Sequence, residues 1–362
     1  MGDPKKRIPI IIPSLEPDER LLALLKSLKE RQLEDIILVN DGSSGSYDHY
    51  FEEAETVYGC TVLKHNVNLG KGRALKTAFN YCLNRFPDLA GCVTADSDGQ
   101  HSPEDIQRCI AAFRQESDGL VLGCRDFDGP QVPNKSRMGN KLTRKICKWL
   151  CGVEVSDTQT GLRVIPQEFM KALLNVPGER FEFETNMLVE SVNNGVKIRE
   201  VPVKTLYDSK ENHATHFDPV KDSIRIYKIF GRMFGKFLVS AVSSSVIDLT
   251  LFALFCHLFR SVIPLVYVAA ATILARVISA IYNYSVNYRF VFRSNSSVAN
   301  TSTKYFILAV IQMCLSAGLV TGITFALNTV PEVYIKAVVD VLLFLVSFWI
   351  QRVYVFARRA PE

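Results

Sequence analysis

The stretch Val-Thr-Ala-Asp-Ser-Asp-Gly-Gln-His, residues 93–101, places two carboxylates directly after a run of apolar residues. That run has the composition of a buried strand, which we expect to end at Asp96. Asp96 and Asp98 stand two positions apart and Gln100 follows, and oxygen ligands of this kind suit Mg²⁺ or Mn²⁺. A cation bound there could neutralise a diphosphate as a leaving group. The alternative interpretation is a polar turn that caps the helix predicted from Pro103.

Strand-like and helix-like segments alternate on both sides of this stretch. Apolar runs predict strands at residues 8–12, 35–40, 61–64, 91–95 and 120–124, and helical periodicity predicts helices at 19–31, 46–58, 72–84 and 103–115. This order predicts a mostly parallel sheet covered by helices. Ligands of such sheets bind at the carboxyl ends of the strands, where both Asp41 and the Asp96 cluster fall.

Further polar motifs follow the predicted strands. A carboxylate at Asp41 could accept a hydrogen bond from the ring N–H of a nucleobase, and the NLGKG motif at 68–72 offers a flexible backbone and a cation, Lys71, near phosphates. Arg125 places a second cation after the next strand, and residues 157–163, DTQTGLR, form a dense polar cluster. Each motif alone could be a turn or a cap. In this order and spacing they predict a site for a nucleotide diphosphate.

The second part of the chain is dominated by four apolar segments, at residues 234–259, 263–286, 305–327 and 333–355. Each is long enough to cross a hydrocarbon layer of about 30 Å, so we expect four transmembrane helices rather than buried helices of a soluble domain. Basic residues gather at alternate flanks: Arg225, Lys228, Arg232 and Lys236; then Arg289, Arg293 and Lys304; then Arg352, Arg358 and Arg359. By the positive-inside rule both termini and the middle loop are expected in the cytosol.

The apolar part contains an internal repeat. Residues 236–242, KFLVSAV, are similar to 304–310, KYFILAV, and residues 287–292, NYRFVF, are similar to 351–356, QRVYVF. The repeat predicts two related helical hairpins. Asp248, Arg276 and Asp340 fall inside the predicted spans, where charged side chains usually face the bundle and can pair with one another. Residues 218–232 have the pattern of a basic amphipathic helix, which we expect on the membrane surface.

The composition narrows the class of protein. The net charge of +5 is better explained by basic membrane flanks than by nucleic-acid binding. Nine cysteines show no paired framework, which favours reduced thiols. His213 and His216 have no acidic partner beside them, so zinc is not expected. The apolar run near the N-terminus is too short for a secretion signal, and the first domain is expected to start in the cytosol.

Taken together, these motifs resemble those of a known protein family. Residues 8–217 resemble a family 2 glycosyltransferase of the GT-A fold, in the branch of dolichol-phosphate mannosyltransferases and bactoprenol glucosyltransferases. The matching elements are Pro13, Asp41, NLGKG at 68–72, DSDGQH at 96–101, GCR at 123–125 and DTQTGLR at 157–163. The apolar part resembles a GtrA-like membrane domain. The expected architecture is therefore an α/β GT-A (Rossmann-like) catalytic domain at 1–217, an amphipathic juxtamembrane helix at 218–233 and an all-α four-helix transmembrane domain at 234–357.

The resemblance also implies residue roles. Asp96, Asp98 and Gln100 would bind the metal; Pro13, Glu16, Asp41, Lys71, Asp96 and Asp98 would bind the nucleotide-sugar; Arg125, Arg137, Asn140 and Arg163 would face the acceptor phosphate; and Asp98, Arg125 and Asp157 would be catalytic. Glu182 and Glu184 are spare carboxylates. One position departs from the family pattern, because Glu16 stands where asparagine is usual.

The implied reaction is inverting transfer of a hexose from a nucleotide-sugar to polyprenyl phosphate, for modification of cell-envelope glycans at the inner or plasma membrane. UDP-glucose is the first expected donor and GDP-mannose the second. A lipid phosphate is already ionised near neutral pH, so positioning and charge stabilisation suffice without a strong general base. The expected partners are the donor, the lipid and the bilayer, with no nucleic acid; a homo-oligomer is compatible with the sequence.

Two other functions are the alternatives to this one. A processive synthase would carry a QxxRW-type motif, and neither Trp149 nor Trp349 has that setting. A non-catalytic, transporter-like membrane protein is the alternative from a different class, since internal repeats are common in transporters. Transfer of sugar to a lipid distinguishes an enzyme from such a protein.

Overall fold

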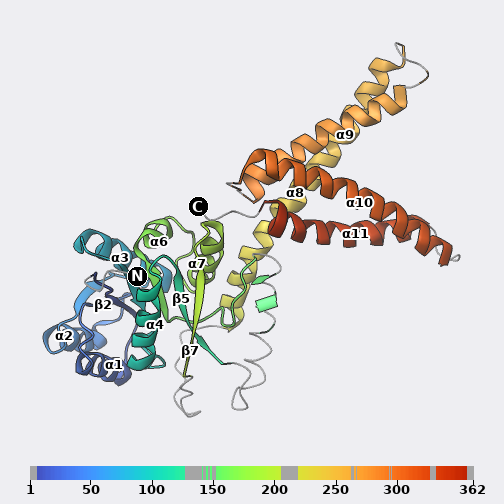
Figure 1. The fold of residues 1–362 in the computed structure, drawn as a ribbon. Coiled ribbons are helices and arrows are strands. Elements are labelled where there is room, and N and C mark those ends of the chain that lie inside the picture. The colour runs from blue at the N-terminus through green and yellow to red at the C-terminus, as the bar shows by residue number, and fades with distance from the viewer. Residues whose placement is uncertain are drawn as a thin grey trace. The chain divides into compact units, whose positions relative to one another are not determined.

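The computed structural model describes residues 6–126, 141, 144–145, 147–148, 152–204, 219–261, 265, 267–292, 294, 296–326 and 332–356. The chain falls into two compact units that divide between Ile226 and Tyr227. Figure 1 shows the elements of both units along the chain.

The first unit is built on a seven-stranded mixed sheet with the strand order β3-β2-β1-β4-β6-β5-β7. The strands are β1 (Ile10–Ser14), β2 (Ile36–Asn40), β3 (Thr61–Lys64), β4 (Gly91–Thr94), β5 (Leu120–Arg125), β6 (Arg163–Pro166) and β7 (Ile198–Val203). β1 pairs in parallel with β2 and β4, β2 pairs in parallel with β3, and β5 pairs in parallel with β7. Only β6 among these strands runs antiparallel to its neighbours, β4 and β5. The predicted α/β class is confirmed, while β6 and β7 were not predicted.

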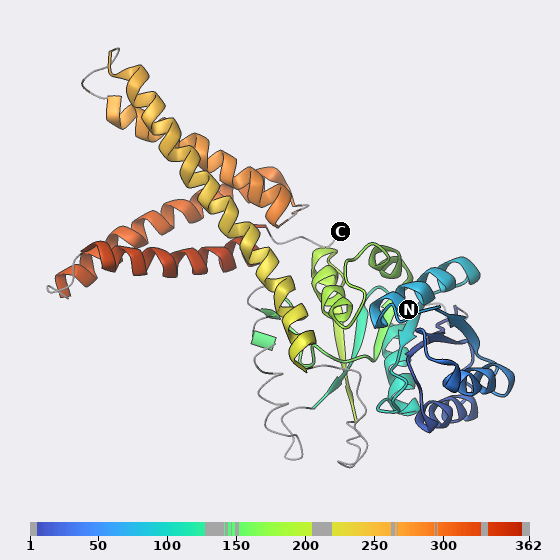
Figure 2. The same cartoon turned by 180° about the vertical axis from the view of Figure 1, so that it is seen from behind.

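Helices cover both faces of this sheet (Figures 1 and 2). One face carries α3 (Lys71–Arg85), α6 (Gln167–Leu173) and α7 (Glu182–Asn193), and the other carries α1 (Glu19–Glu30), α2 (Asp48–Thr56) and α4 (Pro103–Gln115). A 3-10 turn, η1 (Gly45–Tyr47), precedes α2.

Local sequence explains where the predicted helices begin. The Asp18 side chain accepts a hydrogen bond from the Arg20 N–H at the start of α1, and Ser102 caps α4 in the same way through the Asp105 N–H. Buried leucines at helical spacing then pack α1 against strand residues of the core, such as Ile10 and Ile12.

The topology brings the predicted site residues to one edge of the sheet. Because β6 is antiparallel to both β4 and β5, those two strands run in the same direction as β1 and β2. The carboxyl ends of β2, β4 and β5 and the amino end of β6 therefore share an edge. Asp41 and Asp96 follow β2 and β4 there, Arg125 ends β5, and the polar segment 157–163 leads into β6.

The second unit is helical, with α8 (Pro219–Phe259), α9 (Tyr267–Val286), α10 (Val298–Ala326) and α11 (Glu332–Ile350). Short π-helical turns, η2 (Asn287–Val291) and η3 (Gln351–Val355), extend α9 and α11. Among the described residues, three helical stretches are long and apolar enough to cross a membrane: Phe234–Phe259, Val298–Val320 and Val338–Val355. The fourth predicted span, 263–286, contains α9 together with residues outside the described part. α8 runs without a break through the predicted juxtamembrane and first transmembrane segments, whose boundaries stay a prediction.

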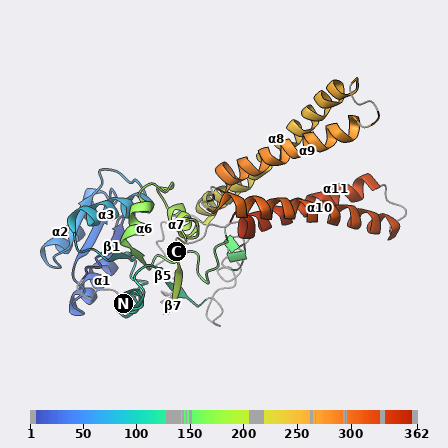
Figure 3. The ribbon, with the colours of Figure 1, turned by 45° about the horizontal axis from the view of Figure 1, so that its top comes forward.

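The internal repeat appears as paired contacts between corresponding residues. Asn287 donates to the Gln351 side chain at 3.0 Å, and Phe292 stacks on Phe356 with ring centroids 5.1 Å apart. The Phe237–Phe348 and Tyr305–Tyr284 ring pairs, at 5.1 and 5.5 Å, occupy equivalent positions in the two halves. Residues that correspond in the repeat thus face one another, which is the arrangement of a local two-fold axis. Figure 3 shows the α8–α9 and α10–α11 hairpins meeting at one end and diverging at the other.

The ionisable residues inside the apolar helices are partnered. Asp248 lies 3.4 Å from the Arg276 guanidinium and accepts a hydrogen bond from Ser279, and Asp340 accepts one from Ser316. The predicted pairing is therefore present for Asp248 and Arg276. Arg276 nevertheless keeps 73% of its side chain exposed.

Candidate active site

The Asp96 carboxylate is the centre of the polar cluster at the carboxyl edge of the sheet. Lys71, the first residue of α3, places its Nζ 2.6 Å from Asp96 Oδ1 and 2.9 Å from Glu184 Oε1 in α7. His101 Nε2 lies 3.4 Å from Asp96 Oδ2. Burial acts to raise the pKa of Asp96, but the neighbouring Lys71 and His101 outweigh it and hold that pKa well below its usual range. Burial acts to lower the pKa of Lys71, but Asp96 and Glu184 raise it above its ordinary value.

Asp98 occupies the turn that follows. Its Oδ1 accepts a hydrogen bond from the Gln100 N–H at 3.0 Å, and Gly99 adopts a φ of +76° that permits this tight turn. Burial raises the pKa of Asp98, and the nearby charge of Asp96 raises it further. The two carboxylates are therefore close enough to repel each other.

The donor set fits a hard divalent cation that is shared with a substrate. Among the described residues, no group of three or more His, Cys, Asp or Glu side chains is placed to hold a metal ion. Asp96, Asp98 and Gln100 instead offer two carboxylates and an amide, and Mg²⁺ is commonly bound by one or two carboxylates with phosphate oxygens completing the shell. A cation would also offset the repulsion between Asp96 and Asp98.

Gly161 forms the wall behind Asp96. A Cβ atom at this position would lie 2.2 Å from Asp96 Oδ2, closer than any side chain tolerates. The Gly161 carbonyl accepts a hydrogen bond from Thr94 Oγ1 at 2.7 Å, which fixes the loop against the end of β4. The polar segment 157–163 therefore shapes the Asp96 site directly, through a glycine that lies inside the DTQTGLR motif.

Asp157 holds Arg125 in place. The Arg125 guanidinium donates to both Asp157 oxygens, with Nε–Oδ2 at 2.7 Å and Nη2–Oδ1 at 3.2 Å. Asp157 is fully buried and also accepts from the Gln159 N–H, whereas the Arg125 side chain is 26% exposed. Two parallel hydrogen bonds fix the orientation of a guanidinium, so Asp157 positions Arg125 at the end of β5.

Arg163, the first residue of β6, lies in the interior of the first unit. Its side chain is completely buried and donates to the Thr160 carbonyl at 2.9 Å and to the Glu184 carbonyl at 2.6 Å, while Nη2 has no hydrogen-bond partner in the structure. Burial lowers the pKa of Arg163, although the Glu184 and Asp157 carboxylates oppose the shift. Its predicted contact with an acceptor phosphate stays a prediction, as do those of Arg137 and Asn140, which lie outside the described residues.

Asp41 organises the loop that precedes Lys71. Its Oδ1 accepts from the Leu69 N–H at 3.0 Å and lies 2.7 Å from His65 Nδ1, and its Oδ2 accepts from the Gly70 N–H at 2.8 Å. Both oxygens are thus engaged within the protein, and Asp41 is 3% exposed. The predicted hydrogen bond from a nucleobase N–H to Asp41 stays a prediction, and the loop-ordering contacts were not predicted.

The first strand and the bend that follows it supply the remaining predicted residues. Pro13 is buried in β1 opposite Val39, and exposed Glu16 donates its N–H to Ser43 Oγ at 2.9 Å. Glu16 has a φ of +48°, a left-handed conformation in which asparagine is enriched over most residues. This conformation gives a physical reason for the asparagine that is usual at the position.

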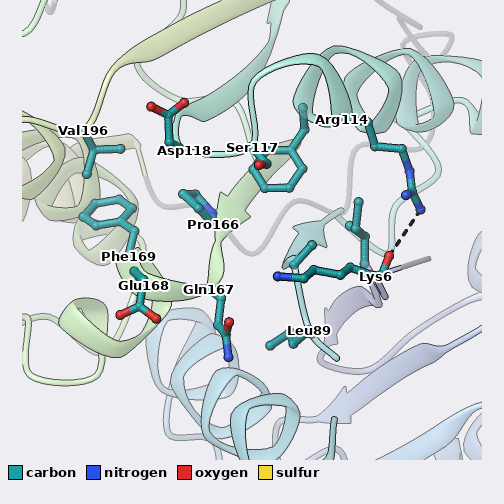
Figure 4. Close-up of a pocket in the computed structure, with 13 residues that line it drawn as sticks. Lys6, Leu89, Arg114, Ser117, Asp118, Pro166, Gln167, Glu168, Phe169 and Val196 are labelled. Carbon is teal, nitrogen blue, oxygen red and sulfur yellow. Dashed lines mark hydrogen bonds between the residues drawn. The ribbon is translucent and has the colours of Figure 1, made fainter. Parts of the chain in front are cut away.

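A separate pocket of about 330 Å³ lies at the opposite edge of the sheet (Figure 4). Residues that precede β1, β4, β5 and β7 line it, including Ile8, Leu89, Asp118 and Val196, together with Pro166 at the end of β6. These are the amino ends of the parallel strands, so the pocket lies at the edge away from the Asp96 cluster. We place the active site at the carboxyl edge, where the charged side chains converge.

Comparison with known families defines the class of protein. Residues 10–174 match the family described as Glycosyl transferase family 2, and residues 236–356 match the one described as GtrA/DPMS, transmembrane domain. The two matches correspond to the sheet unit and the helical unit. The chain therefore carries a family 2 glycosyltransferase domain followed by a GtrA/DPMS transmembrane domain, and it is an enzyme.

Curated relatives are similar to more than half of the chain. The chain is 29% identical over 219 residues to the UDP-N-acetylglucosamine–dolichyl-phosphate N-acetylglucosaminyltransferase of Methanococcus voltae, covering 56% of this chain and 86% of the relative. It is 27% identical over 209 residues to the undecaprenyl-phosphate mannosyltransferase of Micrococcus luteus, covering 54% and 82%. Among solved structures, glucosyl-3-phosphoglycerate synthase from Mycobacterium tuberculosis aligns with a TM-score of 0.47 and 16% identity, over 62% of this chain and 77% of that one.

Proposed function

We propose that this glycosyltransferase moves one hexose from a nucleotide-sugar to the phosphate of a polyprenyl phosphate at the cytoplasmic face of a membrane. The observation that carries the proposal is the charge arrangement at the carboxyl edge of the sheet. Asp96 and Asp98 suit a cation with a diphosphate, while Arg125, fixed by Asp157, offers a cation for a second anion. A site with both features suits a charged donor and a charged acceptor.

The relatives support a lipid phosphate as the acceptor. The names of three of them specify dolichyl phosphate, undecaprenyl phosphate and, for a 26% identical protein of Mycolicibacterium smegmatis, polyprenol monophosphomannose. The sugars in these names differ, but each name contains a polyprenyl-type lipid. The apolar helices of the second unit would hold the enzyme where such a lipid is dissolved.

On the donor side, Asp96, Asp98 and Gln100 would hold Mg²⁺ or Mn²⁺. Such a cation stabilises the negative charge that develops on a departing nucleoside diphosphate. Pro13, Glu16, Asp41 and Lys71 would line the nucleotide end of the site. Asp41 contributes by ordering the backbone at Leu69 and Gly70, which sets the start of α3 and the position of Lys71.

On the acceptor side, Arg125, Arg137 and Asn140 would orient the lipid phosphate, and Arg163, which is completely buried, would act through the Thr160 backbone. An oxygen of that phosphate attacks the anomeric carbon of the sugar, and the bond from that carbon to the diphosphate breaks. The phosphate is already ionised, so no proton has to be removed during the attack. A single displacement inverts the anomeric centre, which gives a β-linked sugar phosphate from an α-linked donor. The contribution of the protein is positioning and charge stabilisation.

UDP-glucose is the donor we propose first, because the DSDGQH and DTQTGLR sequences resemble the bacterial glucosyl branch most closely. GDP-mannose is second, in line with the mannosyltransferase names among the relatives. The Methanococcus voltae relative adds UDP-N-acetylglucosamine to the donors that need testing.

Transfer of labelled sugar into an organic-extractable product tests the proposal. Purified full-length protein would be incubated with undecaprenyl phosphate, Mn²⁺ and each of the three donors, with Asp98→Asn as the inactive control. We expect lipid-phase label from one donor, and loss of that label in Asp98→Asn. Folded protein that labels no lipid from any donor in a broader panel would contradict the proposed function.

A further inference from the structure

The Lys71 ammonium is bound by two carboxylates that come from different elements. It lies 2.6 Å from Asp96 Oδ1, at the end of β4, and 2.9 Å from Glu184 Oε1, in the first turn of α7. The side chains of Lys71 and Glu184 are only 16% and 9% exposed. Lys71 also approaches the face of the Phe181 ring, at 5.8 Å from its centroid. This ion-paired lysine therefore sits inside the site and not on its rim.

Both oxygens of Asp96 are engaged in this arrangement. Oδ2 faces His101 and rests against the backbone at Gly161, where even a methyl group would not fit. Oδ1 is bound by the Lys71 ammonium at 2.6 Å. A metal ion that takes Asp96 as a ligand through Oδ1 would therefore compete with the ammonium, since both are cations attracted to the same oxygen.

The charges of the cluster suit such an exchange. Asp96, Asp98 and Glu184 supply three carboxylates and Lys71 supplies one ammonium, so these four side chains in their ionised forms carry a net charge of −2. One divalent cation would neutralise that charge. Without the metal, Lys71 is the cation that offsets Asp96.

We propose that Lys71 is a resident cation that occupies Asp96 until the metal and the donor diphosphate bind, and that Glu184 is the positioning residue that then retains it. The inference rests on the proposed function, because it assumes a metal–diphosphate donor. On binding, Lys71 leaves Asp96 Oδ1, keeps its bond to Glu184 and turns its free N–H groups to the diphosphate. The site thus exchanges one cation for another without leaving an unpaired carboxylate.

Glu184 is well placed for this task. A buried ammonium that lost its only partner would be strongly disfavoured, so Lys71 could not release Asp96 without a second carboxylate. The backbone carbonyl of Glu184 accepts a hydrogen bond from Arg163 Nη1 at 2.6 Å, which ties the first turn of α7 to β6. Glu184 therefore offers Lys71 a fixed alternative partner to Asp96.

The test measures Mn²⁺ binding to the full-length protein in detergent, without donor or acceptor, from the electron paramagnetic resonance signal of free Mn²⁺. Lys71→Met removes the competing ammonium, and we expect the Kd for Mn²⁺ to fall roughly tenfold. Glu184→Gln leaves Lys71 with Asp96 alone, and we expect that Kd to rise roughly tenfold. In the double variant Glu184→Gln should have no further effect, because Glu184 acts through Lys71.

The neighbouring Lys76–Glu179 pair provides matched controls. Lys76 lies on the same helix and its Nζ is 3.0 Å from Glu179 Oε1, but neither residue contacts Asp96 or Asp98 in the structure. Lys76→Met and Glu179→Gln should leave the Kd for Mn²⁺ unchanged. Lys71→Arg, which keeps the positive charge, should not show the tighter binding of Lys71→Met, and it covers the case in which the methionine variant folds poorly.

Two outcomes would overturn the inference. Weakening by Glu184→Gln of the same size in the Lys71→Met background would mean that Glu184 attracts the metal directly. Equal Mn²⁺ affinity in the wild type, Lys71→Met and Glu184→Gln would mean that the ion pairs only support the fold. Sugar transfer without the predicted Mn²⁺ pattern would reject this inference alone, and the pattern without sugar transfer would reject the proposed function instead.

Discussion

Replacement of Gly161 by alanine is expected to displace the Asp96 carboxylate and to slow sugar transfer. The added Cβ would lie 2.2 Å from Asp96 Oδ2 and 2.7 Å from Oδ1, whereas ordinary van der Waals contact begins at 3.4 Å. The carboxylate and the loop must therefore separate by about 1.2 Å, the difference between 3.4 and 2.2 Å. Neither the Asp96 carboxylate nor the loop at Gly161 can move easily, because Lys71 binds Asp96 and Thr94 donates a hydrogen bond to the Gly161 carbonyl.

A misplacement of about 1 Å at a reacting centre can cost about a hundredfold in rate, so we expect kcat/KM of Gly161→Ala to fall by roughly that factor. Initial rates of label transfer to the lipid measure the loss, and thermal unfolding shows whether the variant is folded. Gly45→Ala is the matched control, because a Cβ there meets nothing closer than 3.8 Å. A folded Gly161→Ala protein with kcat/KM within threefold of the wild type would refute this account of the Asp96 site.

Three further predictions follow from the same contacts. Asp157→Asn weakens the two hydrogen bonds that orient Arg125, so the KM for polyprenyl phosphate should rise about tenfold while the KM for the donor changes little. Equal changes in the two KM values would contradict the proposed role of Arg125 in binding the acceptor. Asp41→Asn removes a charged acceptor of two backbone N–H groups, so amide hydrogen exchange at Leu69 and Gly70 should accelerate and the free energy of unfolding should fall by about 2 kcal/mol. Unchanged exchange at these two amides would rule out the role of Asp41 in ordering the loop. Removal of divalent cations with EDTA should abolish transfer and Mn²⁺ or Mg²⁺ should restore it, because Asp96 and Asp98 would otherwise face the diphosphate without a cation; full activity in EDTA would exclude the metal.

Local patterns in the sequence predicted the first half of the catalytic fold closely. The strand at Thr61–Lys64 and the helix at Pro103–Gln115 have the predicted bounds, and the other early elements differ by only a few residues. These elements are short apolar runs or amphipathic periods, so neighbouring residues suffice to define them. β6 escaped prediction because its four residues, Arg163–Pro166, follow a polar motif and owe their conformation to antiparallel pairing with β4 and β5.

The position of the site was also predictable, because residues that follow parallel strands meet at one edge of the sheet. Asp96, Asp98 and Arg125 lie there as expected. What the sequence could not supply were contacts between distant segments. Burial of Arg163 depends on the Glu184 carbonyl in α7, and the engagement of Asp41 depends on the chain folding back at Leu69 and Gly70.

Glu184 illustrates the same limit. Its sequence neighbourhood, FEFET, suggests only a spare carboxylate in a helix. Its contact with Lys71, 113 positions earlier in the chain, exists only in the folded protein. The internal repeat of the apolar part was easier to interpret, since corresponding residues such as Asn287 and Gln351 turned out to contact each other.

A comparison of two acceptors tests the central claim most directly. Full-length protein would be supplied with the active donor and Mn²⁺, and with either undecaprenyl phosphate or undecaprenol, which lacks the phosphate. The account predicts product only from undecaprenyl phosphate, with phosphorus NMR showing a phosphodiester that joins the lipid to a β-linked sugar. Equal transfer to undecaprenol, or a product whose phosphate remains a monoester, would contradict the claim that the lipid phosphate is the nucleophile.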